Sequence, residues 1–252
     1  MAPTSIQDDH RLFCNYIFFF DSLSQNTIDY QTYLPMFKRI CILLLFTGFI
    51  TNTYAQQQTP DYRALKTQLE EIYKTDQGIR QKFMKVFRKG PKDPDYQRIT
   101  KEMHQIDQAN LKAVTVLLDQ YGWMPYSKVG QVAGDAQFLV IQHSSLKMMQ
   151  KYLPMMKKAA AQGEASSYNV ALMEDRVLMN LGKKQIYGSQ ARSLFKKGQT
   201  KARLFIWPIA DVQNVNKRRK AMGFDRTIEQ QAKDMGAEFD PNEPLPAKVK
   251  EE

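Results

Sequence analysis

The chain has 252 residues and a formal net charge of +10, and 43% of its residues are hydrophobic. That apolar fraction excludes an intrinsically disordered chain and a collagen-like one. Two cysteines are too few for a disulfide-rich mini-protein or for a zinc site built from several thiolates. The length suits one substantial hydrophobic core.

A candidate secretory signal peptide lies at residues 36–55. Lys38 and Arg39 form a positive start, and Ile40–Ile50 is an apolar run of the length expected for such a segment. The run is too short to cross a membrane as a helix. We therefore expect export to the periplasm or the extracellular space after cleavage near Ala55.

The 35 residues before Met36 would be unusual in front of a signal peptide, which normally begins at the N-terminus. The simplest interpretation is that translation starts at Met36 and that residues 1–35 are a mis-annotated upstream extension. The alternatives are two membrane-associated segments, Leu12–Phe20 and Ile40–Ile50, or a real but unusual leader. In the favoured case both cysteines leave with the leader, which excludes thiol chemistry in the mature chain.

Start and stop signals then predict two long helices. The first begins at Thr59–Asp61, where an N-cap oxygen, a proline and an acidic residue follow one another, and it ends at Gly90. The second begins with the same kind of signal at Asp93–Asp95 and ends at Gly122.

Three further helices are expected in the middle of the chain. The stretch 127–150 is apolar nearly all round, which indicates a buried central helix. Pro154 marks the start or a kink of a helix that ends at Gly163. Serines at the start of 166–182 predict the cap of another helix.

The pattern changes near the C-terminus. Residues 185–206 read as two strands of a small hairpin, and Asp211–Lys220 as a short basic helix. The fold class predicted is mainly α: a single helical-bundle domain of about five helices with a small C-terminal β-hairpin. This domain would cover residues 56–235, followed by a flexible tail at 236–252.

Polar side chains interrupt the apolar faces of these helices. Asp76 and Arg80 lie one turn apart on the apolar stripe of the first helix, and Asp107 and Asn110 lie on that of the second. His143 lies in the apolar central stretch. Because an unpaired buried charge costs several kcal/mol, these groups must satisfy one another or a ligand.

Asp175 and Arg176, in the helix at 166–182, would join them if the four helix faces meet. Two interpretations stay open: Asp–Arg pairs that only fix helix packing, or a polar pocket in a helical bundle. In the pocket, Arg80 and Arg176 would hold negative charge. His143, oriented by Asp107 or Asp175, would serve as a general base.

A set of short motifs runs in a fixed order through the mature chain. These are Asp76-Gln77-x-x-Arg80, Asp107-x-x-Asn110, Tyr121-Gly122-Trp123, Gln142-His143, Asp175-Arg176 and Tyr187-Gly188-Ser189-Gln190. Their order and spacing, over residues 65–219, resemble an uncharacterised bacterial family of exported domains of unknown function. The resemblance carries no activity, but it implies that Tyr187, Gln190 and the pair Arg218-Arg219 join the same site.

Several familiar sites have no sequence signature here. The chain has no glycine-rich phosphate loop, no GxSxG elbow and no HExxH motif, and we expect neither a cofactor nor a metal. The basic runs at 196–197 and 217–220 are expected to be solvated surface; the alternative is that they face anionic lipid or glycan of the envelope, rather than nucleic acid. His104 lies off the apolar face and is expected in solvent.

The sequence thus predicts an exported protein with a buried polar pocket that binds, and could hydrolyse, a small polar or anionic ligand. The expected catalytic residues are His143, Asp107 and Asp175, and the expected ligand-binding residues are Asp76, Gln77, Arg80, Asn110, Gln142, Arg176, Tyr187 and Gln190. The alternative is a non-enzymatic envelope module whose buried Asp–Arg pairs only fix packing, so enzymatic activity stays open.

Overall fold

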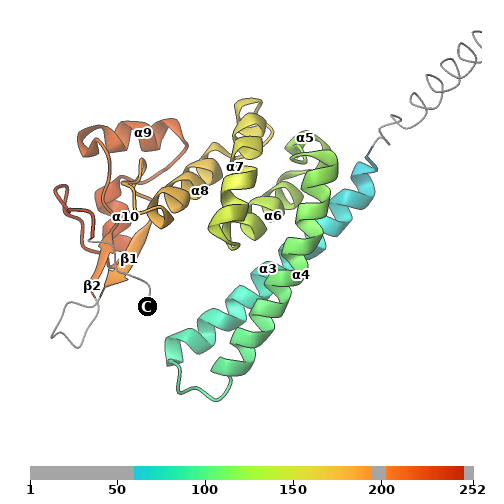
Figure 1. Cartoon of the computed structure of the whole chain (residues 1–252), viewed down its shortest axis with the longest axis horizontal. Helices are drawn as coiled ribbons and strands as arrows, with labels where there is room; N and C mark the ends of the chain where they lie inside the picture. The colour runs from blue at the N-terminus through green and yellow to red at the C-terminus, as the bar shows by residue number, and fades with distance from the viewer. Residues whose placement is uncertain (1–59, 195–202, 247–252) are drawn as a thin grey trace, which may run out of the picture. The chain divides into compact units, whose positions relative to one another are not determined.

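The structure is a computed structural model that describes residues 60–194 and 203–246 (Figure 1). The expected signal peptide at 36–55, the extension before it and the basic run at 196–197 lie outside these residues. The described residues form eight α-helices and one small antiparallel hairpin, so the mainly α prediction is confirmed.

Two long helices, α3 (Tyr62–Lys89) and α4 (Tyr96–Tyr121), pack side by side (Figure 1). The N-cap of α3 is Asp61, whose carboxylate accepts two backbone N–H groups of the first turn at 3.1 Å each. Both helices end at the predicted glycines, Gly90 and Gly122, whose positive φ angles suit a residue without a side chain.

The predicted central helix at 127–150 covers α5 (Tyr126–Val129), α6 (Gln131–Gln142) and the start of α7 (Leu146–Ala161). The rest of α7 corresponds to the helix predicted around Pro154. The chain breaks at Gly130, which has a φ of 80°, and again before Ser145, whose hydroxyl caps the first turn of α7. The prediction was wrong because an apolar run indicates burial, and burial does not require one continuous helix.

The next elements follow the predicted order. Pro154 lies inside α7, and the N-cap of α8 (Ser167–Asn180) is Ser166, one of the two serines predicted for that position. The hairpin consists of β1 (Ala191–Leu194) and β2 (Arg203–Ile206), paired antiparallel. Its first strand therefore begins later than the sequence suggested.

Three short helices complete the fold: η1 (Val212–Asn214), α9 (Val215–Ala221) and α10 (Ile228–Met235). The last was not predicted, although Thr227 and Gln230 form a capping box at its start. That spacing is a recognisable helix signal in the sequence.

The beginning of the expected tail contacts the hairpin. The Glu238 carbonyl accepts the Ile206 N–H at 2.9 Å, and the Arg203 guanidinium donates to Glu243 at 3.0 Å. These contacts hold this part of the chain to β2.

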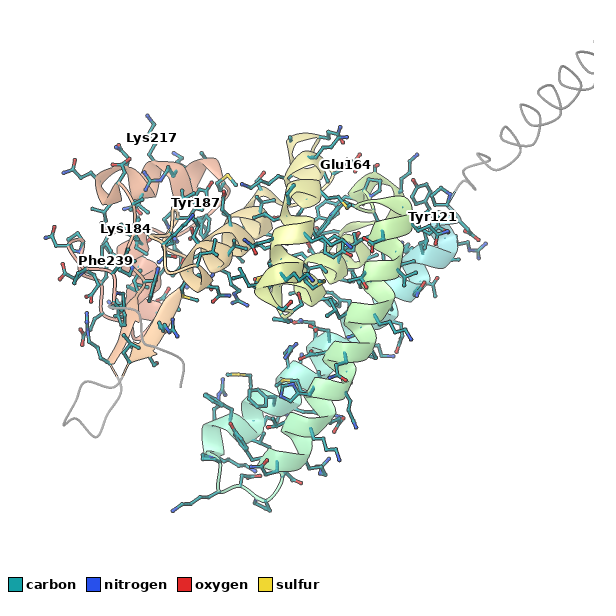
Figure 2. The ribbon with its side chains drawn as sticks, viewed as in Figure 1. Tyr121, Glu164, Lys184, Tyr187, Lys217 and Phe239 are labelled. Atoms are coloured by element: carbon teal, nitrogen blue, oxygen red, sulfur yellow. The ribbon has the colours of Figure 1, made fainter. Side chains whose placement is uncertain are left out.

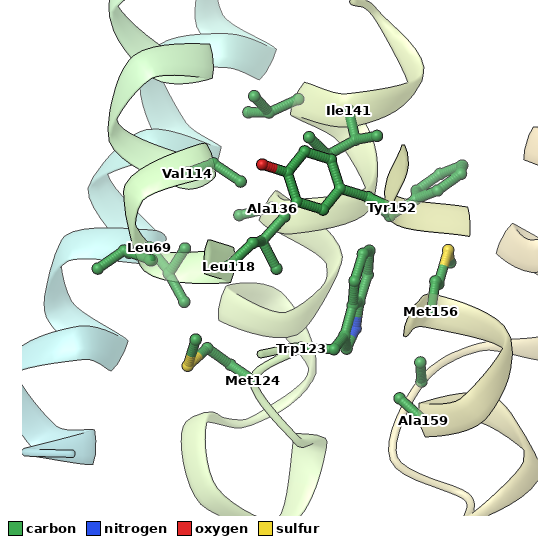
Figure 3. Close-up of a cluster of buried hydrophobic side chains, with 14 of the residues drawn as sticks. Leu69, Val114, Leu118, Trp123, Met124, Ala136, Ile141, Tyr152, Met156 and Ala159 are labelled. Atoms are coloured by element: carbon green, nitrogen blue, oxygen red, sulfur yellow. The ribbon is translucent and has the colours of Figure 1, made fainter. Parts of the chain in front are cut away.

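The main hydrophobic core lies between α3, α4 and α6–α8 (Figure 3). Tyr152 is completely buried there, and its hydroxyl donates to Asp119 Oδ1 at 2.9 Å. Burying each large apolar side chain contributes about 1.5–3 kcal/mol, so this core supports the helices around it. No helix among the described residues is both long enough and apolar enough to cross a membrane.

Candidate functional site

A cavity of about 180 Å³ lies between α3, α4 and the C-terminal end of α6. Nine residues line it: Asp76, His104, Asp107, Gln108, Asn110, Leu111, Val140, His143 and Ser144. Most of these side chains are polar, although the cavity adjoins the main hydrophobic core.

Regular helical spacing carries two of these side chains inward, and a third lies at a helix end. Asp76 follows Ile72 by one turn on the buried face of α3 and is only 1% exposed. Asn110 lies on the buried face of α4 and is 7% exposed. His143 is the C-cap of α6, where the Ser144 hydroxyl donates to the Ile141 carbonyl and helps to end the helix.

Arg80 connects the two long helices. Its Nη2 lies 3.5 Å from Asp76 Oδ1 and forms a close ion pair with Asp107 Oδ1. Asp76 and Arg80 belong to α3, whereas Asp107 belongs to α4. The guanidinium therefore bridges two carboxylates across the helix pair.

Three buried nitrogens beside this ion-pair network lack a hydrogen-bond partner within the described part of the chain. They are Arg80 Nε, Asn110 Nδ2 and His143 Nδ1. His143 Nδ1 does lie 3.5 Å from Asp76 Oδ1, but the two groups form no hydrogen bond. A buried donor without a partner costs about 1–3 kcal/mol, which an acceptor placed in the cavity would recover.

Asp76 is the most buried charged group of the cavity. Burial raises its pKa, but His143, Arg80 and the Gln77 amide, which donates to Oδ2 at 2.7 Å, outweigh that effect. The pKa of Asp76 is therefore lowered from its ordinary value of 3.8. The carboxylate stays ionised at neutral pH, facing both the imidazole and the guanidinium.

Replacing Asp76 by asparagine should lower the free energy of unfolding by about 1–3 kcal/mol at neutral pH. The folded protein holds this proton more weakly than the unfolded chain does, so the carboxylate stabilises the fold above pH 3.8. That stabilisation is lost as the pH falls through the lower, folded-state pKa. Urea unfolding at a series of acidic pH values measures this. The difference in free energy of unfolding between wild type and Asp76→Asn should shrink as the pH falls, and a difference that does not change with pH would contradict the prediction.

Asp175 does not lie on the cavity. It is completely buried, and its carboxylate accepts the backbone N–H groups of Ile186, Tyr187 and Ser189 at 2.7, 3.0 and 2.9 Å. Tyr187 lies beside α8 (Figure 2), and its hydroxyl donates to Glu174 Oε2, midway along that helix, at 3.5 Å. Asp175 therefore holds the turn after α8, which also explains why β1 begins only at residue 191.

Arg176 reaches from α8 toward the cavity without lining it. Its Nη1 donates to the Gln142 carbonyl at 3.1 Å, and its Nε donates to Gln190 Oε1 at 3.1 Å. Gln142 immediately precedes His143, so Arg176 links the turn after α8 to the end of α6. Burial lowers the pKa of Arg176, whose hydrogen bonds go to neutral oxygens.

Arg218 and Arg219, on α9, hold the same turn from its other side. Arg218 Nε donates to the Ile186 carbonyl at 3.1 Å, and Arg219 Nη1 donates to the Tyr187 carbonyl at 2.9 Å. Arg219 is only 1% exposed and stacks over the Phe224 ring at 4.2 Å. These side chains build a second polar group that belongs to the turn.

The sequence-predicted site residues thus fall into two groups instead of one. Asp76, Arg80, Asp107, Asn110 and His143 gather at the cavity, with Gln77 beside Asp76. The turn group consists of Asp175, Arg176, Tyr187, Gln190, Arg218 and Arg219, with the Gln142 carbonyl between the two groups.

Sequence reasoning missed three polar lining residues, His104, Gln108 and Ser144, and two apolar ones, Leu111 and Val140. His104 is exposed, as expected, but it lies at the rim of the cavity. Its signal was the spacing to Asp107 and Gln108, which places all three on one face of α4. Across the described ranges, no three His, Cys, Asp or Glu side chains are grouped to hold a metal ion.

The fold and cavity define a small, mainly helical domain with a polar cavity between its two long helices and α6. The model of the family of unknown function DUF6624 matches residues 63–237, and the chain belongs to this family. The resemblance indicated by the short motifs is confirmed at the level of an uncharacterised family. Among curated proteins and solved structures, no match to the chain was found.

Proposed function

We propose that this protein is exported and that its cavity binds a small, uncharged polar ligand, which His143 helps to hydrolyse. The observation that supports the binding site is that Asn110 Nδ2 and His143 Nδ1 lack hydrogen-bond partners among the described residues, beside the buried carboxylate of Asp76. Both residues line a cavity of about 180 Å³, large enough for a compact polar group. An acceptor oxygen of the ligand would satisfy Asn110 Nδ2.

The charges around the cavity favour an uncharged ligand over an anion. Arg80 is already engaged by Asp76 and Asp107, and Arg176 donates to carbonyl oxygens outside the cavity. An anion would therefore approach two carboxylates and a single arginine, which is electrostatically unfavourable. Uncharged amides, esters and hydroxyl-bearing molecules meet both the donors and the acceptors of the lining.

His143 and Asp76 support general-base hydrolysis. Asp76 lies 3.5 Å from Nδ1 and would stabilise the imidazolium that forms when Nε2 takes a proton from water. The water oxygen would bond to the ligand's acyl carbon, and the proton would pass from Nε2 to the leaving group as its bond to that carbon breaks. The Ser144 hydroxyl already donates to a backbone carbonyl at 2.6 Å, which favours water as the nucleophile.

A second function is favoured by a different observation, the bridge that Arg80 makes between α3 and α4. In this alternative the protein is a non-enzymatic envelope module, and its buried ion pairs only fix the helix packing. Truncating Arg80 would then reduce stability and change no binding or catalytic property.

Replacing Asn110 by leucine separates the two functions. The substitution removes an unmet buried donor at similar volume, so the free energy of unfolding should stay equal or rise. Thermal-shift measurements with small amides, acetate esters and N-acetylated sugars should show stabilisation of the wild type that is lost in Asn110→Leu. Asp119→Asn, on the exposed side of the same helix, is the matched control and should keep the shift.

Hydrolysis of the same esters is the second readout of this experiment. His143→Gln should lower kcat by about a hundredfold or more while the melting temperature is retained. If no compound shifts the wild type and only stability changes across the variants, the packing function stands instead.

The proposed export rests on the apolar run Ile40–Ile50, which follows two basic residues. Mass spectrometry of the protein purified from its host tests it directly. A chain beginning after Ala55 would support export, and an intact segment 36–55 on the purified protein would contradict it.

A further inference from the structure

The end of the α3–α4 pair carries a concentration of positive charge. We call residues 82–102 the tip; they include seven basic and three acidic residues, a formal net charge of +4. The tip comprises the last turns of α3, the connection between the helices and the first turns of α4. Figure 1 shows this connection at the free end of the pair, away from α6 to α10.

Every acidic side chain of the tip is neutralised within it. The ion pairs, at 2.9 to 3.2 Å, are Asp93 with Lys89, Asp95 with Arg98, and Glu102 with Lys82. The other four bases are exposed and have no ion-pair partner among the described residues: Lys85, Arg88, Lys92 and Lys101. The tip therefore presents uncompensated positive charge to its surroundings.

Large apolar side chains lie among these bases. Phe87 is 55% exposed and Met84 is 45% exposed, one turn apart on α3. Phe83 joins them, with its ring centroid 5.7 Å from that of Phe87 and 6.1 Å from that of Tyr96 on α4. The aromatic contacts fix this apolar surface on a rigid helix pair, so presenting it costs little conformational entropy.

We propose that the tip docks on the surface of an anionic lipid bilayer. Lys and Arg attract anionic headgroups, while exposed Phe and Met side chains enter the boundary between headgroups and acyl chains. The combination fits a membrane surface better than a nucleic acid, whose phosphates would leave Met84 in water. Docking is independent of the proposed hydrolysis because no residue of the tip lines the cavity.

Removing tip charge should abolish most of the binding. The triple variant Lys85→Gln, Arg88→Gln, Lys92→Gln is compared with the wild type by co-sedimentation with vesicles of phosphatidylcholine containing phosphatidylglycerol. Each basic residue near an anionic surface strengthens binding about fivefold, so the triple variant should bind roughly a hundredfold more weakly. Vesicles of phosphatidylcholine alone should bind neither protein appreciably.

The matched control removes the same charge elsewhere. Lys217→Gln, Lys220→Gln, Lys233→Gln changes exposed lysines of α9 and α10, and Lys217 points away from its helix (Figure 2). This control should bind as the wild type does. Equal loss in both triple variants would show that only overall charge matters and would overturn the proposal.

Phe87→Ser tests the apolar contribution without changing charge. It should weaken vesicle binding severalfold while circular dichroism shows an unchanged fold, since the side chain is more than half exposed. Hydrogen exchange of the full chain shows which segment contacts the vesicles. Binding through the apolar run at 40–50 would leave the exchange rates of the tip unchanged. Protection of 82–95 by anionic vesicles is expected; its absence, or stronger protection by duplex DNA, would refute membrane docking.

Discussion

Replacing Asp175 by alanine is expected to lower the free energy of unfolding by about 3–5 kcal/mol. The carboxylate is completely buried and accepts three backbone N–H groups of the turn after α8. Alanine would leave these donors unpaired in a site that water reaches poorly. Urea unfolding monitored by circular dichroism measures the loss.

Two comparisons make this test specific. Asp234→Ala removes an exposed carboxylate of α10 that pairs with Arg226, so it should change the stability far less. Asp175→Asn keeps one acceptor oxygen but adds amide hydrogens facing N–H donors, and it should also be strongly destabilising. If Asp175→Ala cost no more than Asp234→Ala, the turn would not depend on the Asp175 carboxylate.

Replacing Gly188 by alanine should cost about 2–4 kcal/mol, for two separable reasons. Its φ of 72° lies in the left-handed region, which penalises a residue with a side chain. A Cβ would also lie 2.6 Å from Ile228 Cδ1 and 2.8 Å from Ile209 Cδ1. These isoleucines belong to the second hydrophobic cluster and would have to shift.

Gly182 provides the matched control, because its φ is 67° but no atom lies within 4 Å of the position of an added Cβ. Gly182→Ala should therefore show only the backbone cost, about 1–2 kcal/mol. The difference between the two variants in thermal or urea unfolding measures the steric part. Equal losses would mean that the isoleucines give way freely.

Local signals explain how well the long helices could be predicted. The ends of α3 and α4 fall at Gly90 and Gly122, because a C-terminal glycine relieves a backbone constraint that depends only on neighbouring residues. The cap of α8 at Ser166 was predicted for the same reason. The central stretch was predicted wrongly because apolar side chains indicate burial but not where a helix ends, and α5, α6 and α7 are separated at Gly130 and before Ser145.

The candidate site was likewise predicted in part, where local sequence signals were sufficient. Helical periodicity correctly placed Asp76 and Asn110 on buried faces, since the period depends only on the geometry of one helix. The period could not show that Asp175, which is equally buried, faces the turn after α8 and not the cavity. Which surfaces meet depends on how the chain turns back after α8.

The sequence by itself determined the helical class, the hairpin, most helix ends and the inward faces of the polar residues. All of these follow from contacts within a few residues along the chain. Only the tertiary structure decided that His143 meets Asp76 and that Arg80 joins α3 to α4, because those neighbours are far apart in sequence. It also decided that Asp175 serves backbone amides, since packing selects among the several partners that one buried charge could have.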